Sequence, residues 1–450
     1  MGNLSTNIKR YFVYALVLLC IYFLIVNYNS DSLLVLIQFI LIIVHCASKL
    51  FTKCSVDYGL TQIFYVFSLF FLGIAPLFQY LEHVTIWGGI PFSDMDYIET
   101  NFLIIISLFL YQFIYDKIFK SRKIRGEKYI YYGKNSNHRK KNLTVLIFLT
   151  IISAIYTIMR YNFSVSSLLF RVDGEGDGVN NPLGLINSFI IRPIPSICFL
   201  FYIIRYKFHL KRKNISILEF IWLLVILLTL SPIGVPRFVV AAFYIPIAMM
   251  YLPFLKKKYN LMLFLAFALI IIFPLLDLVR RENTEYALVN SLDMLLHGHF
   301  DSYQMFMRTV STNFVTYGKQ LLGVLFFFIP RSLWPTKPVG SGYVIAHENG
   351  YYFDNVSMCY LGEGYINFGY LGVIIFAILI ACFNARMDCR YWFEGGRFRQ
   401  TFSIIFLISL GMEFIILRGA LLNVFPAYLA FIISVYFVGK ISSIRFIRHI

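Results

Sequence analysis

The chain has few charged residues: Asp, Glu, Lys and Arg make up 14% of its 450 residues, while hydrophobic residues make up 59% and the mean hydropathy is +0.71. A soluble domain carries about 25% charged residues. The composition therefore excludes an ordinary soluble protein and indicates a polytopic membrane protein, most of whose surface faces lipid.

The seven cysteines include no Cys-x-x-Cys pair, and most lie in or beside apolar stretches. This spacing excludes a disulfide framework and a cysteine-based metal site. The sequence also has no internal repeat and no low-complexity tail. No small-residue cleavage site follows the first apolar stretch, so we expect that stretch to be a retained helix rather than a signal peptide.

Stretches of about twenty apolar residues, long enough to cross a bilayer as a helix, recur along the chain. They predict an all-α polytopic membrane protein with about twelve transmembrane helices. The predicted spans are 11–27, 33–47, 59–79, 99–116, 142–159, 186–206, 216–231, 238–255, 260–278, 369–385, 400–417 and 421–439.

The net charge of +17 follows from the predicted topology. With both termini in the cytoplasm, and counting residues at the helix ends, 29 of the 40 Lys and Arg residues fall on the cytoplasmic side, ten of them in the loop 117–141. Counting helix ends and nearby buried acids, 17 of the 23 acidic residues fall outside. The positive-inside rule accounts for this distribution. A nucleic-acid partner is not needed to explain it.

The topology predicts three regions: transmembrane helices one to nine with basic cytoplasmic loops at 1–278, a large periplasmic loop with interfacial helices at 279–368, and three further transmembrane helices at 369–450. A loop of this length is usually functional or disordered, and its aromatic and turn residues favour order. Residues 320–330 are apolar but too short to span, so we expect an interfacial helix that ends at Pro330.

Arginines on the outer side oppose the usual topological bias, so their presence needs a reason. They are Arg160, Arg171, Arg192, Arg237, Arg280, Arg281, Arg308, Arg331 and Arg418. Each alone is explained by snorkelling to lipid phosphates or by pairing with an acid such as Glu282. As a set they favour convergence on a lipid-linked phosphate or pyrophosphate, because the guanidinium fork matches phosphate oxygens. The predicted pyrophosphate-binding residues are Arg237, Arg280, Arg281, Arg331, Lys337 and Arg418.

The segment "FFFIPRSLWPTKPVGSG" (326–342) places two of these cations among prolines. Prolines stiffen the backbone, so Arg331 and Lys337 lose little entropy on binding. Sugars stack on aromatic faces, and we predict Trp334, Tyr343 and Tyr365 as stacking residues.

This segment, together with "GHFDSYQMFMR" (298–308) and "LGEGYINFGYLGVIIF" (361–376), resembles the Wzy-type oligosaccharide repeat-unit polymerases, which build O-antigen or capsule chains. "SPIGVPRFVVAAF" and "LRGALLNVF" resemble other recurring sites of that family. The resemblance covers the topology and roughly the second half of the chain.

The resemblance implies a metal-independent, GT-C-like membrane glycosyltransferase without a cofactor, in the bacterial cytoplasmic (inner) membrane with its active site facing the periplasm. It implies transfer of a growing glycan from undecaprenyl pyrophosphate to the non-reducing end of a second undecaprenyl-pyrophosphate-linked repeat unit, with a chain-length regulator as partner. Preorganised arginines would stabilise the departing pyrophosphate.

An acceptor hydroxyl needs a general base. The loop offers five candidates: Asp301, His347, Glu348, Asp354 and Glu363. We predict Glu363, flanked by glycines at the start of a span, and Asp301 as the catalytic carboxylates. The spacing of His297, His299 and Asp301 does not favour a metal, because histidines two apart on a helix do not share a face.

Two acids lie within predicted spans, where an unpaired charge is costly. We expect Asp277 and Glu413 to be paired, with Arg280 and Arg418 as the nearest cations in the sequence.

Two other functions fit the same topology. One is the O-antigen ligase, which transfers a finished chain to a lipid-A core. The other is a flippase or transporter of lipid-linked oligosaccharide, although transporters usually carry repeated halves and none is detected here.

Overall fold

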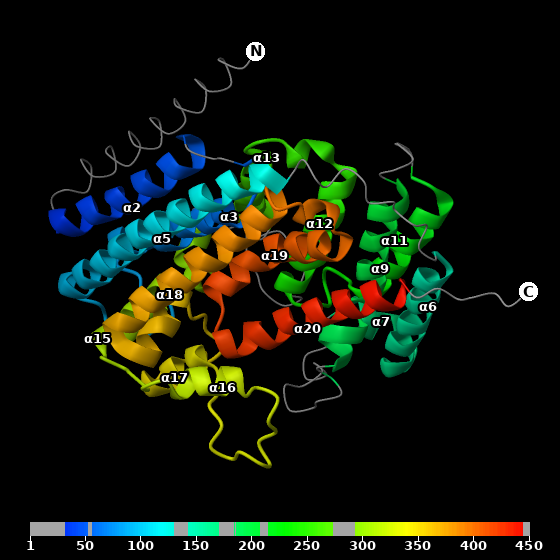
Figure 1. Cartoon of the computed structure of the whole chain (residues 1–450). Helices are drawn as coiled ribbons and strands as arrows, with labels where there is room; N and C mark the ends of the chain where they lie inside the picture. Colours follow the sequence, from blue (N-terminus) through cyan, green and yellow to red (C-terminus); the bar gives the residue numbers. More distant parts are fainter. Residues whose placement is uncertain are drawn as a thin grey trace, which may run out of the picture.

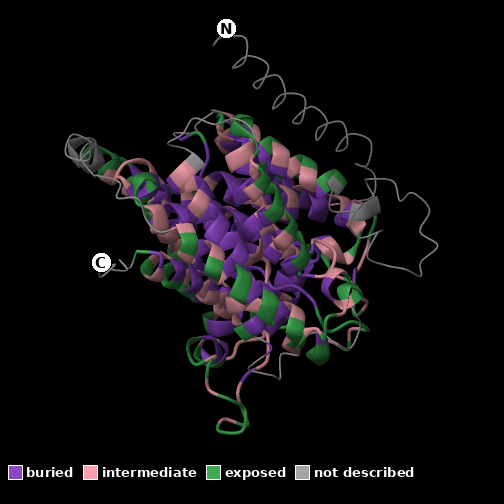
Figure 2. Cartoon of the chain, turned by 90° about the vertical axis from the view of Figure 1, so that its right-hand side faces the viewer, coloured by how far each residue is buried: buried purple, intermediate pink, exposed green. Residues whose placement is uncertain are grey.

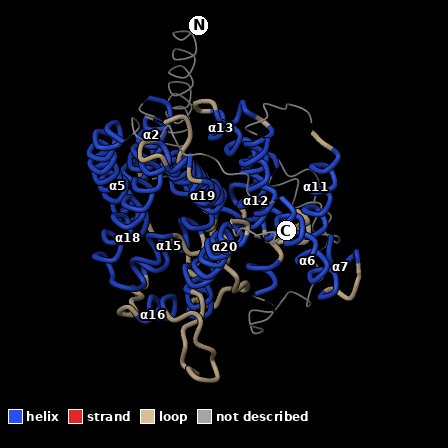
Figure 3. Tube along the Cα trace, turned by 45° about the vertical axis from the view of Figure 1, so that its right-hand side comes forward, coloured by secondary structure: helices blue, strands red, loops and turns tan. Residues whose placement is uncertain are grey.

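The computed structural model describes residues 32–52, 56–129, 143–170, 184, 186–207, 215–272 and 293–443. All regular secondary structure within these ranges is helical, without a strand (Figure 3). In the first half of the chain the helical segments are α2 (Leu33–Thr52), α3 (Leu60–Phe67), η1 (Ser68–Ile74), α4 (Ala75–Leu81), α5 (Asp94–Tyr129), α6 (Leu143–Arg160), α7 (Val165–Leu169), η3 (Asn187–Ile191), α9 (Ile194–Tyr202), η4 (Ile203–Lys207) and α11 (Ile217–Thr229).

The second half contains α12 (Arg237–Tyr251), η5 (Pro253–Lys256), α13 (Asn260–Phe267), η6 (Ala268–Ile272), η7 (Asp293–Leu296), η8 (Gly298–Phe300), α15 (Ser302–Ser311), α16 (Lys319–Leu325), α17 (Ser341–Glu348), α18 (Tyr360–Trp392), η9 (Gly396–Phe398), α19 (Gln400–Arg418) and α20 (Leu421–Ile441).

Eight helices among the described residues are long and apolar enough to cross a membrane. Three more apolar helices are shorter: Ile217–Thr229, Arg237–Tyr251 and Asn260–Ile271. At 1.5 Å per residue, a helix of 13 residues is about 20 Å long, less than the ~30 Å apolar thickness of a bilayer. The chain is an α-helical polytopic membrane protein. The predicted span 11–27 lies outside the described residues.

The outward face of α5 shows why lipid is the solvent of this bundle. Phe102, Ile106, Phe109 and Phe113 follow one another at helical spacing and are between 38% and 63% exposed. Such a stripe is unstable in water and normal against acyl chains. Buried residues fill the centre of the bundle and exposed ones its outside (Figure 2).

The helices pack around two main apolar cores. One core joins α2, α3, α5, α15 and α18, and the other joins α6, α9, α11, α12 and α20. Residues of α19 contribute to both, so this helix holds the two groups together. In Figure 1, α18 lies along α5, and α19 lies between α18 and α12.

Segments 293–358 gather at one end of the bundle, below α18 and α20 in Figure 1. We call this the outer end, after the predicted topology. The predicted interfacial helix 320–330 is shorter than expected, because α16 ends at Leu325. The next residues form a protruding loop, and the carbonyls of Phe327 and Ile329 accept hydrogen bonds from Lys337 instead of continuing the helix.

A sharp bend interrupts α18 at Phe368 and Gly369, where the backbone leaves helical geometry and Gly369 takes φ +60°. The bend brings Gly364 and Gly372 together. A Cβ on Gly372 would lie 1.8 Å from the Gly364 carbonyl oxygen, a distance no side chain tolerates. The first eight residues of α18 are therefore folded back against the long segment, which begins where the sequence predicts span ten.

We expect Gly372→Ala to lower the free energy of unfolding by about 3 kcal/mol or more, because the new methyl overlaps a backbone carbonyl that cannot move aside. Thermal unfolding in detergent measures the change. The matched control is Gly350→Ala, where a Cβ meets no atom within 4 Å and only the φ of +63° is unfavourable. This control should cost about 1 kcal/mol. Equal losses for the two variants would contradict the close approach.

Candidate functional site

The ion pair between Arg418 and Asp301 lies at the outer end. Arg418 is the last residue of α19, and its Nη2 atom lies 3.2 Å from Asp301 Oδ1 and 3.2 Å from the Gly298 carbonyl oxygen. Asp301 is 1% exposed, whereas the Arg418 side chain is 24% exposed. Its Nε atom is buried without a hydrogen-bond partner. The pair therefore presents a cation that is fixed on one side and partly open.

Asp301 has both carboxylate oxygens occupied. Oδ2 accepts from the Trp87 indole N–H at 2.9 Å and from the Ser357 backbone N–H at 3.1 Å. Oδ1 accepts from the Ser357 hydroxyl as well as from Arg418. These donors fix the carboxylate in one orientation, and it holds Arg418 in place.

Glu363 lies on the folded-back start of α18 and is 2% exposed. Its Oε1 atom accepts from the Ser341 hydroxyl and, at 2.8 Å, from the backbone N–H of Leu421. Leu421 is the first residue of α20, so the carboxylate meets the positive end of a 21-residue helix. Oε2 makes no hydrogen bond to any described residue. The two predicted carboxylates thus meet the same connector, residues 418–421, from different sides.

Arg331 and Lys337 contact backbone carbonyls of their own loop. Arg331 donates to the carbonyls of Lys337 and Pro338, at 2.7 and 3.1 Å. Lys337 Nζ donates to the carbonyls of Phe327 and Ile329. Burial and the neighbouring guanidinium lower the pKa of Lys337. Both cations thus close the loop 326–340, which protrudes in Figure 3, and their binding of a shared anion stays a prediction.

Two further outer arginines contact groups of the protein. Arg192 donates to Tyr161 and to the carbonyls of Thr229 and Leu168, between α6, α7 and α11. Arg308 lies over the Phe92 ring at 4.0 Å and donates to the Tyr351 hydroxyl at 2.9 Å. Burial raises the pKa of Tyr351, and Arg308 opposes that rise. Both guanidinium groups contact protein partners, and their convergence on an anion stays a prediction.

Arg237 lies at the same end of the bundle as the end of α19. It is the first residue of α12, which packs antiparallel to α19, with Ala241 against Gly411 and Met249 in one core with Phe406. Arg280 and Arg281, the other predicted ligands, lie outside the described residues.

The three predicted stacking residues have different surroundings. Tyr365 is 1% exposed and packs edge-on against Tyr370, so neither of its faces is open to a sugar. Tyr343 is 44% exposed and stacks on His347. Trp334 is partly exposed in the protruding loop.

Glu413 does not pair with Arg418 as expected. Its Oε1 atom accepts from the Asn384 amide at 2.8 Å, while Arg418 pairs with Asp301. Asp277 lies outside the described residues. Within the described part of the chain, no three His, Cys, Asp or Glu side chains form a group able to hold a metal. A groove of about 620 Å³ at the other end, beside Tyr436 and Lys440, contains none of the predicted site residues.

Trp87, Ser341 and Ser357 contact the site carboxylates but are absent from the sequence-based prediction. The carboxylates that they contact lie 214, 22 and 56 residues away in the chain, respectively. One signal was present for Trp87. It is one of only four tryptophans in the sequence, and it lies in the acidic outer loop Glu82–Glu99 rather than in an apolar span.

Comparison with known proteins finds no matching family, no matching curated protein and no matching solved structure.

We expect Asp301→Asn to lower the free energy of unfolding by about 3 kcal/mol, because it leaves Arg418 without its counter-ion in a largely buried site. The same substitution in an Arg418→Met background should cost clearly less, since no unpaired charge remains. Asp354→Asn, at an exposed position, is the control. A loss that is identical in the two backgrounds would show that the pair contributes nothing.

A second prediction concerns the loop 326–340. Lys337→Met removes both hydrogen bonds to Phe327 and Ile329, so chymotrypsin should cleave the loop faster while the thermal unfolding midpoint of the bundle stays unchanged. Lys319→Met, an exposed lysine on the same outer surface, should leave the cleavage rate as it is. Unaltered cleavage of the Lys337 variant would contradict the closing role.

Proposed function

We propose that this chain is a membrane glycosyltransferase that polymerises lipid-linked oligosaccharide repeat units at the outer leaflet. The observation that carries the proposal is the meeting of Arg418, Asp301 and Glu363 on the connector between α19 and α20. Arg418 is a partly open cation, and Leu421, three residues later, donates its N–H to Glu363, a carboxylate with one unoccupied oxygen. This pairing supplies the two groups that transfer from a lipid pyrophosphate requires.

Arg418 is the proposed anion-binding group. Nη2 is held by Asp301 and Gly298, which fixes the guanidinium, and the exposed remainder of the side chain is directed to a ligand. Arg237, at the start of the neighbouring antiparallel α12, is proposed to add a second positive charge at this end. In a poorly hydrated site, fixed cations stabilise a departing diphosphate more strongly than water does. Asp301 is then a positioning residue.

Glu363 is the proposed general base. The hydroxyl of the acceptor sugar attacks the anomeric carbon of the donor glycan, its proton passes to Glu363 Oε2, and the bond from that carbon to the pyrophosphate oxygen breaks. The lipid pyrophosphate leaves with the electron pair of that bond. Ser341 and the Leu421 N–H occupy Oε1, so they orient the carboxylate and leave Oε2 for the substrate.

The test is reconstitution of the purified protein in liposomes with a synthetic lipid-linked repeat unit. The proposal predicts a ladder of products that a chelator does not suppress. Glu363→Gln should abolish the ladder, and Arg418→Lys should reduce it by about 100-fold, since a lysine cannot reproduce the guanidinium fork. Glu348→Gln, at an exposed position of α17, is the matched control.

Three results would contradict the proposal. They are a ladder unchanged by Glu363→Gln in folded protein, transfer only to a lipid-A core, as a ligase performs, and passage of the lipid-linked unit across the bilayer with no new glycosidic bond. Thermal unfolding of each variant separates lost chemistry from lost structure.

A further inference from the structure

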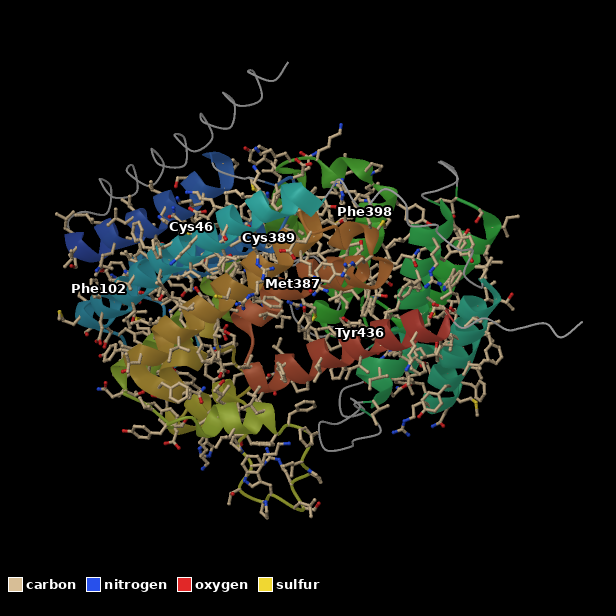
Figure 4. All side chains as sticks on the ribbon, viewed as in Figure 1. Cys46, Phe102, Met387, Cys389, Phe398 and Tyr436 are labelled. Atoms are coloured by element: carbon tan, nitrogen blue, oxygen red, sulfur yellow. The ribbon has the colours of Figure 1, made fainter. Side chains whose placement is uncertain are left out.

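The groove at the end of the bundle opposite the outer end lies between the start of α19 and the end of α20. Its described lining residues are Thr401, Ile433, Tyr436, Phe437, Gly439, Lys440 and Ser443. They include a lysine and two hydroxyls but no acid. The volume of about 620 Å³ falls within the range of about 300–1,000 Å³ that is usual for ligand clefts. Figure 4 shows Tyr436 on the part of α20 nearer its C-terminal end.

The α20 side of the groove changes from apolar to cationic along the helix. Ile433, Tyr436 and Phe437 are between 49% and 57% exposed, and Lys440 follows on the same helix face. At 1.5 Å per residue, Lys440 lies about 10 Å beyond Ile433 along the axis. Because α20 is long and apolar enough to cross a membrane, this order places an apolar surface at acyl-chain depth and a cation toward the headgroups.

Gly439 allows the two walls of the groove to approach each other. A Cβ on this residue would lie 3.0 Å from Thr401 Oγ1 and 3.2 Å from Phe201 Cζ. Any larger residue would therefore press α20 away from α19 and α9. The close approach keeps the Thr401 hydroxyl and the Lys440 side chain on one groove.

A second cation lies behind this groove. Arg205 of η4 is 8% exposed, and its Nε and Nη2 atoms donate to Gln400 Oε1 and Ser442 Oγ, both at 2.8 Å. Gln400 and Ser442 are the sequence neighbours of the lining residues Thr401 and Ser443. The guanidinium is thus attached to both walls from the protein side.

Arg205 has no carboxylate partner among the described residues. Its Nη1 atom is buried without a hydrogen-bond partner, and the titratable groups that interact with it are Tyr206 and Cys198. The adjoining sequence segments 208–214 and 444–450 contain Lys and Arg but no Asp or Glu. A cation removed from water needs a compensating negative charge. An anion held beside Lys440 supplies it.

We propose that this groove is a binding site for one anionic phospholipid. Lys440 and the hydroxyls of Thr401 and Ser443 contact the phosphate, and an acyl chain lies along the apolar part of α20. Arg205 adds positive potential from behind, because charges are poorly screened inside the protein. Basic pockets between membrane helices on the cytoplasmic side are typical sites for anionic headgroups, and the topology predicts that side for this end. The inference does not depend on the proposed glycosyl transfer.

The test is fluorescence quenching in bilayers by phospholipids with brominated acyl chains, which quench an indole only at close range. Full-length protein with Tyr436→Trp reports on the groove, and protein without this substitution gives the background from the native tryptophans. Brominated phosphatidylglycerol should bind at the reporter about 5-fold more tightly than brominated phosphatidylcholine. Raising the salt concentration should lower this preference.

Lys440→Met in the reporter protein should remove most of the preference, because it removes the cation that contacts the phosphate. The matched control is Lys257→Met, which removes an exposed lysine between α12 and α13 that does not line the groove. This control should keep the preference. An unchanged thermal unfolding midpoint shows that each variant is folded.

Four results would overturn the proposal. Equal binding of the two lipids would show that the groove does not select an anion. A preference that survives Lys440→Met would place the selective site elsewhere. Quenching by neither lipid would show that another protein chain, or a second copy of this one, covers the groove. Displacement of the brominated lipid by glycerol 3-phosphate would show that a free phosphate compound, not a lipid, is the ligand.

Discussion

Arg418 ends α19 with its guanidinium on the carboxylate of Asp301, and the organisation of the outer end depends on this contact. Asp301 binds Trp87 from the loop after α4 and Ser357 from the segment before α18, so a single anion joins three parts of the chain that are distant in sequence. A charge removed from water must be compensated by several donors at once. That requirement selects these particular segments more specifically than apolar packing would. In lipid, apolar side chains gain little free energy by contacting one another instead of acyl chains.

Two of the buried carboxylates take hydrogen-bond donors from the starts of helices. Glu363 accepts from the first N–H of α20, and Asp388 accepts from the first two of α3. Each carboxylate satisfies N–H groups that a helix cannot satisfy internally. Glu413 has no helix end beside it and accepts from the Asn384 amide instead. The same principle thus explains where Glu363 and Asp388 find their donors.

Hydropathy and charge were sufficient to predict the helical membrane fold and most segment positions, because both depend on composition over about twenty residues. The start of the long part of α18 was also predicted closely. The roles of individual side chains could be predicted less well from the sequence. Arg331 and Lys337 were predicted to bind a ligand, and no sequence pattern revealed that they also donate to carbonyls of their own loop. No local pattern reveals the partners of Asp388, because Leu60 lies 328 residues and Tyr115 lies 273 residues earlier in the chain.

The fold-back at Phe368 and Gly369 affects how the protein adapts to bilayers of different thickness. Membrane helices adjust to a thicker or thinner bilayer by tilting, and groups carried at different depths on separate helices would shift relative to one another. Here the short arm 360–367 is bonded through its last carbonyls to residues 316 and 318 and through Glu363 to the start of α20. The position of this arm is therefore set by its contacts with the outer segments and not by the length of the transmembrane span below it. The spacing of the outer polar groups should therefore be insensitive to lipid chain length, even where the helices below change their inclination.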